Sequence, residues 1–156
     1  MQDEKEWFGD SIRECERCMY LLAFDILQNN EDVQDAIQDA ILKAYSSLDQ
    51  LKDRRKLKAW LMKILLNVSY DIARKRKITV NIEDIEDGVV TSKSDQTDSI
   101  LLRDLVMRLK PPYRTVVILF YYQDFSIKEI SDITGSNLST VKKQLQRARE
   151  QLKEMI

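Results

Sequence analysis

The amino-acid sequence predicts an all-α protein made of two small helical domains joined by a flexible acidic linker. Hydrophobic residues make up 44% of the 156 residues, as is typical of a chain that folds around a core. The chain has only 3 Gly and 2 Pro, too few for the many turns of an all-β protein, and residues that favour helices dominate. We expect the first domain over residues 1–78, the linker over 79–100 and the second domain over 101–156.

Membrane and export segments are not expected. The longest apolar runs, such as Val116–Tyr122, are much shorter than the roughly 20 residues that a helix needs to cross a bilayer. The first ten residues are acidic and lack the basic, apolar pattern of an export signal. We therefore expect a cytoplasmic protein without membrane insertion.

The sequence shows none of the motifs that are typical of common enzyme active sites. The chain has no histidine, and we find no glycine-rich phosphate loop, nucleophile elbow or isolated carboxylate pair. Cys15 and Cys18 form a single C-x-x-C pair, without the second pair or the histidines that would complete a zinc site. We predict no catalytic residue, no metal site and no cofactor, and we interpret the two cysteines as thiols on a helix.

The first domain contains an amphipathic helix with one unusual leucine. Leu42 points nearly opposite to the apolar stripe, among Asp35, Gln38 and Asp39. An exposed leucine in an acidic patch is typical of a protein-binding spot, although a single exposed leucine is also common without any function. The stripe, which we expect in the core, consists of Val33, Ala36, Ile37, Ala40, Ile41, Ala44, Tyr45 and Leu48.

A basic loop and a second helix follow over residues 51–78, where 10 basic and 2 acidic side chains give a net charge of +8. Basic residues interleaved with Trp60, Asn67 and Tyr70 suit contact with melted DNA, whose bases stack on aromatic rings. A basic helix is also often only a soluble face, and we expect Trp60 to be buried rather than stacked on a base. The apolar stripe of this helix contains Trp60, Leu61, Ile64, Leu65, Val68 and Ile72.

Charge alternates along the whole chain. Residues 1–50 carry −8, residues 79–104 carry −5 and residues 105–156 carry +4, although the net charge of the chain is −1. Two basic blocks separated by an acidic one indicate two surfaces for a polyanion such as DNA.

Residues 79–99 lose helical periodicity and form the linker. Parts of it are expected to dock on a partner or on the domains through Val80, Ile82, Ile85, Val89 and Val90.

The second domain begins with two helices that break at Pro111 and Pro112. We expect both helices to pack behind the helices that follow them. Their core candidates are Val116, Val117, Leu119, Phe120 and Tyr121.

A helix-turn-helix follows from Ser126. Ser126 and Glu129 have the spacing of a capping box, and Gly135 lies where the chain must turn. Asn137 or Ser139 can cap the next helix. The second helix has its apolar positions at Leu138, Val141, Leu145, Ala148 and Leu152. Its opposite face, which such motifs place in the major groove of DNA, consists of Ser139, Thr140, Lys143 and Arg147, flanked by Lys142, Gln146 and Arg149.

The two halves together closely resemble regions 2 and 4 of extracytoplasmic-function sigma factors of the sigma-70 family. The region 2 resemblance is carried by DVQDAIQDAILKAYSSLDQLKDRRKLKAWLMKILLNVSYDIARKRK. The region 4 resemblance is carried by LKPPYRTVVILFYYQDFSIKEISDITGSNLSTVKKQLQRAREQLK. The resemblance spans roughly residues 10–78 and 101–153, in the order that the family has.

The resemblance implies an alternative sigma factor that directs core RNA polymerase to promoters. Its implied partners are the clamp of the largest polymerase subunit, promoter DNA and a cognate anti-sigma factor. The implied minus-35 residues are Ser139, Thr140, Lys142, Lys143, Gln146 and Arg147. The implied minus-10 residues are Leu51, Lys52, Arg54, Arg55, Lys56 and Asn67. The implied polymerase-binding residues are Asp35, Gln38, Asp39 and Leu42.

Three positions depart from the usual family pattern, and other functions stay open. Ile41 stands where the family often has phenylalanine, Leu51 where an aromatic residue is frequent, and Ser131 where alanine is usual. The main alternative is a helix-turn-helix regulator that binds duplex operator DNA without acting as a polymerase subunit. A pure protein-interaction module would leave the two basic blocks unexplained.

Overall fold

The computed structural model describes residues 3–79 and 98–156, with side chains described for residues 3–76 and 102–156. The prediction that apolar linker residues dock on other parts of the chain lies outside the described residues. In the described part all regular secondary structure is helical, with no strand, which confirms the all-α prediction. The longer helices are α1 (Glu4–Leu27), α2 (Asn30–Ser46), α3 (Leu57–Thr79), α4 (Asp98–Arg108), α5 (Tyr113–Val117), α6 (Ile127–Thr134) and α7 (Leu138–Met155). Short helical turns are η1 (Leu48–Gln50), η2 (Arg54–Lys56) and η4 (Ile118–Tyr122), the last of these π-helical.

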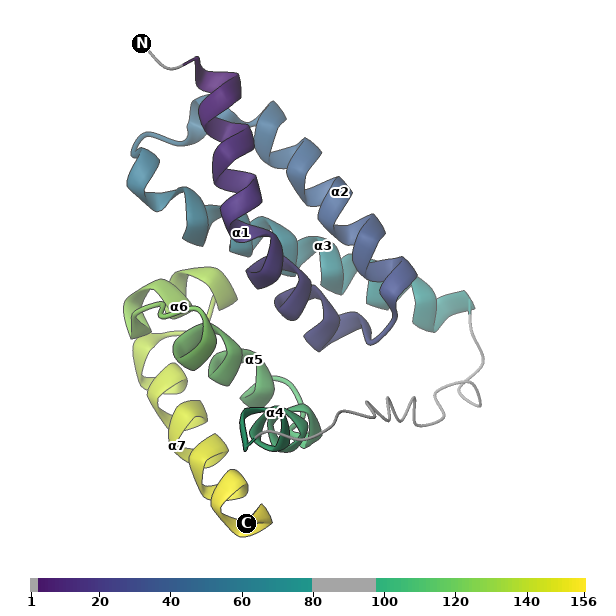
Figure 1. The fold of residues 1–156 in the computed structure, drawn as a ribbon, viewed down its shortest axis with the longest axis vertical. Coiled ribbons are helices and arrows are strands. Elements are labelled where there is room, and N and C mark those ends of the chain that lie inside the picture. Colours follow the sequence, from purple (N-terminus) through teal and green to yellow (C-terminus); the bar gives the residue numbers. More distant parts are fainter. Residues whose placement is uncertain (1–2, 80–97) are drawn as a thin grey trace.

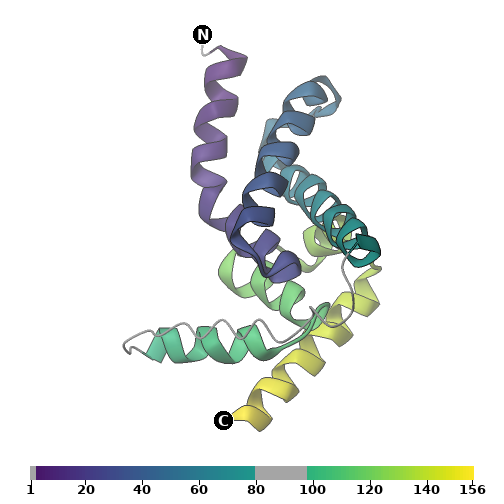
Figure 2. The ribbon, with the colours of Figure 1, turned by 90° about the vertical axis from the view of Figure 1, so that its right-hand side faces the viewer.

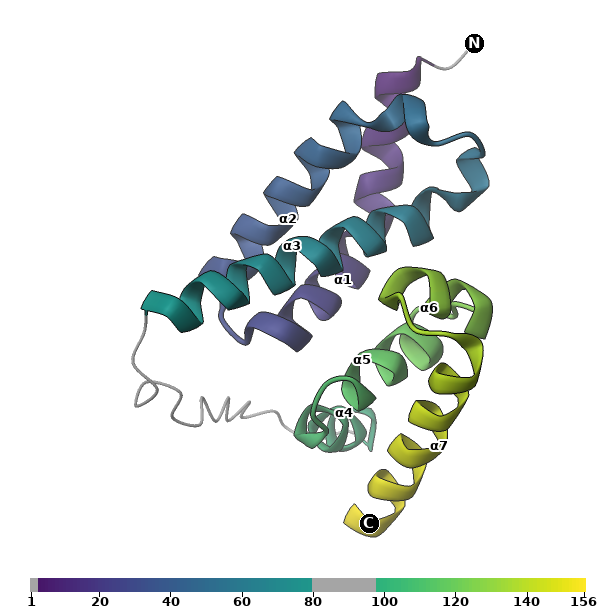
Figure 3. The same ribbon diagram turned by 180° about the vertical axis from the view of Figure 1, so that it is seen from behind.

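Helices α1, α2 and α3 form the first half of the molecule, in the upper part of Figure 1. The break between α1 and α2 occurs where Gln28 takes a left-handed backbone conformation (φ 54°). The Asn29 side chain then caps α2 by accepting a hydrogen bond from the Asp32 backbone N–H at 3.0 Å. Figure 3 shows η1 and η2 in the segment that carries the chain from α2 to α3.

The second half contains α4 to α7, with the helix-turn-helix formed by α6 and α7. Ser126 and Glu129 form the predicted capping box at the start of α6. Gly135 ends α6 with φ +79°, a conformation that residues with a Cβ rarely adopt. Helix α4 extends sideways from the rest of this half, as Figure 2 shows.

Two predicted core tyrosines prove to be exposed. Tyr45 is 43% exposed and packs its ring at the edge of the core, 5.3 Å from the ring of Phe8. Tyr121 is 48% exposed. In both cases the ring is at the margin of an apolar stripe, where the phenolic hydroxyl keeps access to polar partners.

The two halves pack against each other, which the sequence did not predict. One cluster of buried apolar residues contains Met19 and Leu61 from the first half together with Leu119, Ile130 and Leu145 from the second. Helix α3 contacts α6, and α1 contacts both α5 and η4. The main hydrophobic core therefore continues from one half into the other.

Candidate nucleic-acid interface

Helix α7 presents a polar and basic face to solvent. Asn137 begins the helix by accepting a hydrogen bond from the Thr140 backbone N–H at 2.8 Å, which selects Asn137 over Ser139 as the cap. Val141, Leu145 and Ala148 are buried on the opposite face. Thr140 is half-buried, and the exposed predicted residues are Ser139, Lys142, Lys143, Gln146 and Arg147.

One end of the α7 stripe differs from the sequence prediction. Leu138, placed on the apolar stripe by its spacing, is 46% exposed. It is the first residue of the helix, and the packing against the rest of the second half begins only at Val141. An apolar side chain therefore lies beside the basic face, where it can contact an apolar group of a partner.

Arg149 is held by an aromatic residue instead of pointing freely into solvent. Its Nε donates to the Tyr121 hydroxyl at 2.5 Å, and its guanidinium lies 5.7 Å from the centre of the Tyr121 ring. The partner found, from η4, could not be inferred from the helical pattern of α7.

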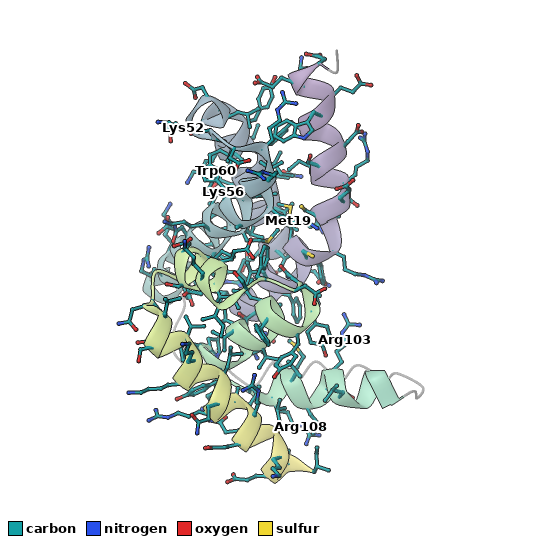
Figure 4. All side chains as sticks on the ribbon, turned by 90° about the vertical axis from the view of Figure 1, so that its left-hand side faces the viewer. Met19, Lys52, Lys56, Trp60, Arg103 and Arg108 are labelled. Atoms are coloured by element: carbon teal, nitrogen blue, oxygen red, sulfur yellow. The ribbon has the colours of Figure 1, made fainter. Side chains whose placement is uncertain are left out.

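In the basic loop before α3, some side chains contact other residues of the protein and others project into solvent. The Arg54 guanidinium lies over the Trp7 ring, 4.3 Å from its centre. Arg55 pairs with Asp53, whose carboxylate also accepts the Arg55 backbone N–H, and these hydrogen bonds lower the pKa of the Asp53 carboxyl. Lys52 and Lys56 are exposed and project from the surface beside Trp60 in Figure 4.

A groove between α2 and α3 brings two of the predicted surfaces side by side. It has a volume of about 510 Å³ and contains Leu42 from the predicted polymerase-binding set and Asn67 from the predicted DNA-binding set. Trp60 is half-buried and also lines it, so its ring is neither fully in the core nor fully free. The sequence placed these residues on separate segments and gave no signal that they meet.

The face of α2 that carries Leu42 is exposed as predicted. Leu42 is 66% exposed, the most of any large apolar residue described inside a helix. Asp35, Gln38 and Asp39 are exposed on the same helix, and Asp39 pairs with Lys43 at 3.7 Å. An apolar side chain surrounded by carboxylates can bind a surface that is itself apolar at its centre and basic around it.

The two cysteines are not arranged for metal binding or for rapid thiol chemistry. Cys15 is buried, and desolvation raises the pKa of its thiol to about 11 against the opposing effect of Lys58. Burial also raises the pKa of Cys18. Across residues 3–79 and 98–156 no cluster of three acidic, histidine or cysteine side chains could hold a metal ion.

None of the helices described is long and apolar enough to span a bilayer.

Each half of the chain matches a protein-family model. Residues 12–78 match the model of sigma-70 region 2, and residues 99–152 match the model of sigma-70 region 4. The RNA polymerase sigma factor SigV of Bacillus subtilis is 32% identical, over 94% of this chain and 89% of the relative. The ECF RNA polymerase sigma factor SigW of the same organism is 26% identical, over 98% of this chain and 90% of the relative.

Solved structures show the same arrangement of helices. The sigma factor RpoE of Bartonella quintana, solved with the anti-sigma factor NepR, has 25% sequence identity and a TM-score of 0.75, with 94% of each chain covered. CnrH, solved with the cytosolic domain of CnrY, has a TM-score of 0.70 at 22% identity, which supports the fold. The likeness therefore extends over both halves of the molecule.

Proposed function

This chain belongs to the extracytoplasmic-function sigma factors of the sigma-70 family, and from that premise we propose how its surfaces divide the work of promoter recognition. It is an alternative sigma factor, which binds core RNA polymerase and directs transcription initiation at particular promoters. The single observation that carries this function is that both sigma regions occur in one chain, in the family's order and at nearly the full length of SigV.

The second half, over residues 101–156, recognises the minus-35 element through α7. Its exposed face combines long cationic side chains with an amide, which suit guanine acceptors, phosphates and adenine edges in the major groove. The capped N-terminus and the glycine turn fix the angle between α6 and α7. The recognition set is Ser139, Thr140, Lys142, Lys143, Gln146 and Arg147.

The first half, over residues 1–78, recognises the minus-10 element through the segment before α3. Lys52 and Lys56 are free to meet phosphates, whereas the partners of Arg54 and Arg55 hold the loop in shape. Asn67 lies in the groove between α2 and α3, which has room for an extruded base. The minus-10 set is Leu51, Lys52, Arg54, Arg55, Lys56 and Asn67.

The acidic face of α2 binds the clamp of the largest polymerase subunit. Asp35, Gln38 and Asp39 surround the exposed Leu42 on that face.

Residues 79–100 connect the two halves as a linker. This sigma factor also has a cognate anti-sigma factor as a partner, since the related sigma factor RpoE was solved with the anti-sigma factor NepR.

A promoter-binding polymerase subunit works in the cytoplasm and needs no catalytic group or cofactor of its own. The polymerase supplies the nucleotidyl transfer, and the sigma factor supplies the selection of DNA. The alternative, a helix-turn-helix regulator that binds operator DNA alone, is not favoured by the match to sigma region 2.

Run-off transcription with core RNA polymerase over genomic fragments tests this function. We expect discrete transcripts with the full chain and none with core polymerase alone. The variant Lys52→Ala/Lys56→Ala should reduce transcript yield, whereas the charge-matched control Lys5→Ala/Lys153→Ala should not. Specific operator binding without polymerase, together with no transcript, would replace the sigma assignment by the regulator.

A further inference from the structure

The first two turns of α1 contact both ends of the segment that joins α2 to α3. The Arg54 guanidinium, in η2, lies over the Trp7 ring at 4.3 Å from its centre. Phe8, the next residue of α1, packs its ring 5.3 Å from that of Tyr45, near the end of α2. Figure 3 shows this segment beside the N-terminal turns of α1. Two neighbouring aromatic residues therefore hold a segment that is distant from them in the sequence.

The minus-10 loop, residues 51–56, lies between these two contacts. Leu51 is half-buried against the main hydrophobic core. The ion pair of Asp53 with Arg55 is internal to the loop, so it shapes the loop without joining it to another element. The cation–π contact is different, because it joins the loop to α1.

The Trp7 ring has a rigid base. Trp7 is half-buried and packs against the main hydrophobic core. Its backbone N–H donates to the Asp3 carbonyl at 2.9 Å, and its own carbonyl accepts the Ser11 hydroxyl at 2.9 Å. An aromatic ring fixed in this way can keep a guanidinium, and the loop that carries it, in one place.

Holding the loop in advance has a consequence for DNA binding. A loop that moves freely must be ordered when it meets the melted strand, and this ordering reduces the affinity. Neither Trp7 nor Phe8 belongs to the part of the chain that matches sigma-70 region 2, which begins at residue 12. The match to region 2 therefore gives these two aromatic residues no role.

We propose that Trp7 is a positioning residue for minus-10 recognition, which holds Arg54 and with it the minus-10 loop in the arrangement that meets the melted strand. Trp7 acts through Arg54 and does not itself touch DNA. Phe8 supports the same arrangement by packing against Tyr45 before the loop begins. This inference rests on the proposed function, because the minus-10 element is what the loop is positioned for.

Three variants separate the cation–π contact from simple packing. Trp7→Leu keeps an apolar side chain against the core but removes the aromatic face, whereas Trp7→Phe keeps an aromatic face. The matched control is Tyr20→Leu, which removes another half-buried ring of α1, one that stacks on Phe24 at 5.8 Å. Circular dichroism should show the same helix content in all three variants.

Limited trypsin digestion of the free, full chain measures how well the loop is held, because Lys52, Arg54, Arg55 and Lys56 are all exposed cleavage sites. In Trp7→Leu the initial rate of cleavage at these sites should rise about two- to fivefold, the size expected for an exposed cation–π contact. Trp7→Phe and Tyr20→Leu should cleave there at nearly the wild-type rate. Cleavage after Lys143, in the second half, is the internal reference and should be equal in all the proteins.

Transcription with core polymerase measures the functional effect. Trp7→Leu should lower transcription about two- to fivefold at promoters with the preferred minus-10 sequence and reduce the differences among minus-10 variants. The ranking of minus-35 variants should not change. Trp7→Phe should retain most of the activity. In an Arg54→Leu background, Trp7→Leu should cause no further loss, because the contact through which it acts is already absent.

The proposal is overturned if Trp7→Leu leaves both the trypsin rates and the minus-10 preference unchanged. Equal losses in Trp7→Phe and Trp7→Leu, in proportion to their thermal stability, would show that Trp7 only packs against the core. A full further loss from Trp7→Leu in the Arg54→Leu background would show that it does not act through Arg54. Failure of the wild type to transcribe from any fragment would contradict the proposed function alone, since the trypsin digestion is measured without polymerase or DNA.

Discussion

At the scale of single residues, the partner of each arginine indicates its role. Arg149 contacts Tyr121, Arg54 contacts Trp7 and Arg114 contacts Asp25, whereas Arg147 is exposed on the polar, basic face of α7. A cation that already has a protein partner contributes to the structure, and a free cation can bind DNA. The spacing of residues in the sequence predicts on which face of a helix each arginine lies. It does not predict which residue each arginine contacts.

Arg147→Ala is expected to reduce promoter discrimination. If Arg147 forms a bidentate contact to a base edge, its loss reduces binding by about 1–3 kcal/mol at the preferred minus-35 sequence and flattens the differences among variants. Transcription from a set of minus-35 variants measures this effect.

Arg149→Ala serves as the matched comparison on the same helix. Because Arg149 is tied to Tyr121, its loss should leave the ranking of promoter variants unchanged and slightly lower the thermal stability of the second half. Equal, sequence-independent losses from the two variants would show that Arg147 does not contact bases.

Cys15 is expected to react slowly with alkylating reagents in the folded protein. Raising the pKa from 9.0 to about 11 lowers the thiolate fraction at pH 8 about a hundredfold, and the fraction rises as the pH approaches 11. Mass spectrometry after iodoacetamide treatment at pH 8, with the urea-unfolded chain as the reference, measures the difference. Equal rates in the folded and unfolded chains would contradict the burial of this thiol.

At the scale of elements, the turn between α6 and α7 depends on one glycine. Gly135 has φ +79°, and no atom lies within 4 Å of the position that a Cβ would take. A substitution there is therefore strained by the backbone alone, and Gly135→Ala should destabilise the second half by about 1–2 kcal/mol. Chemical denaturation measures the loss. The control Ser136→Ala, one residue later, should have a smaller effect, and the opposite order would contradict the importance of the left-handed turn.

A separate prediction concerns the exposed face of α2. Asp35→Arg combined with Leu42→Arg should weaken binding to core polymerase at least tenfold, because it reverses a charge and removes an apolar contact at the centre of the face. Both side chains are exposed, so circular dichroism should show unchanged helix content. A pull-down with core polymerase measures the binding, and unchanged retention would remove this face from the polymerase interface.

At the scale of the whole molecule, the shared core should make the two halves unfold together. Trp7 and Trp60, the only two tryptophans of the chain, both lie in the first half, whereas helix content reports on both halves. Thermal curves followed by tryptophan fluorescence and by circular dichroism should therefore coincide in the wild type. They should separate in Asp25→Ala, because this variant leaves the buried Arg114 of the second half without the carboxylate that it contacts in the first half. Separate transitions in the wild type would contradict a continuous core.

The sequence by itself determined the local features of this protein. The helices, the capping box at Ser126, the turn at Gly135 and the exposed Leu42 all follow from the spacing and identity of residues a few positions apart. The family resemblance, confirmed by the matches to both sigma regions, came from the same local patterns. Only the tertiary structure decided which distant residues meet. The pairing of Asp25 with Arg114 and Thr115 across 89 and 90 positions, and the groove that joins Leu42 to Asn67, depend on how whole helices pack. Periodicity determines which face of a helix is buried, but the partner of that face is set by the packing of the entire chain.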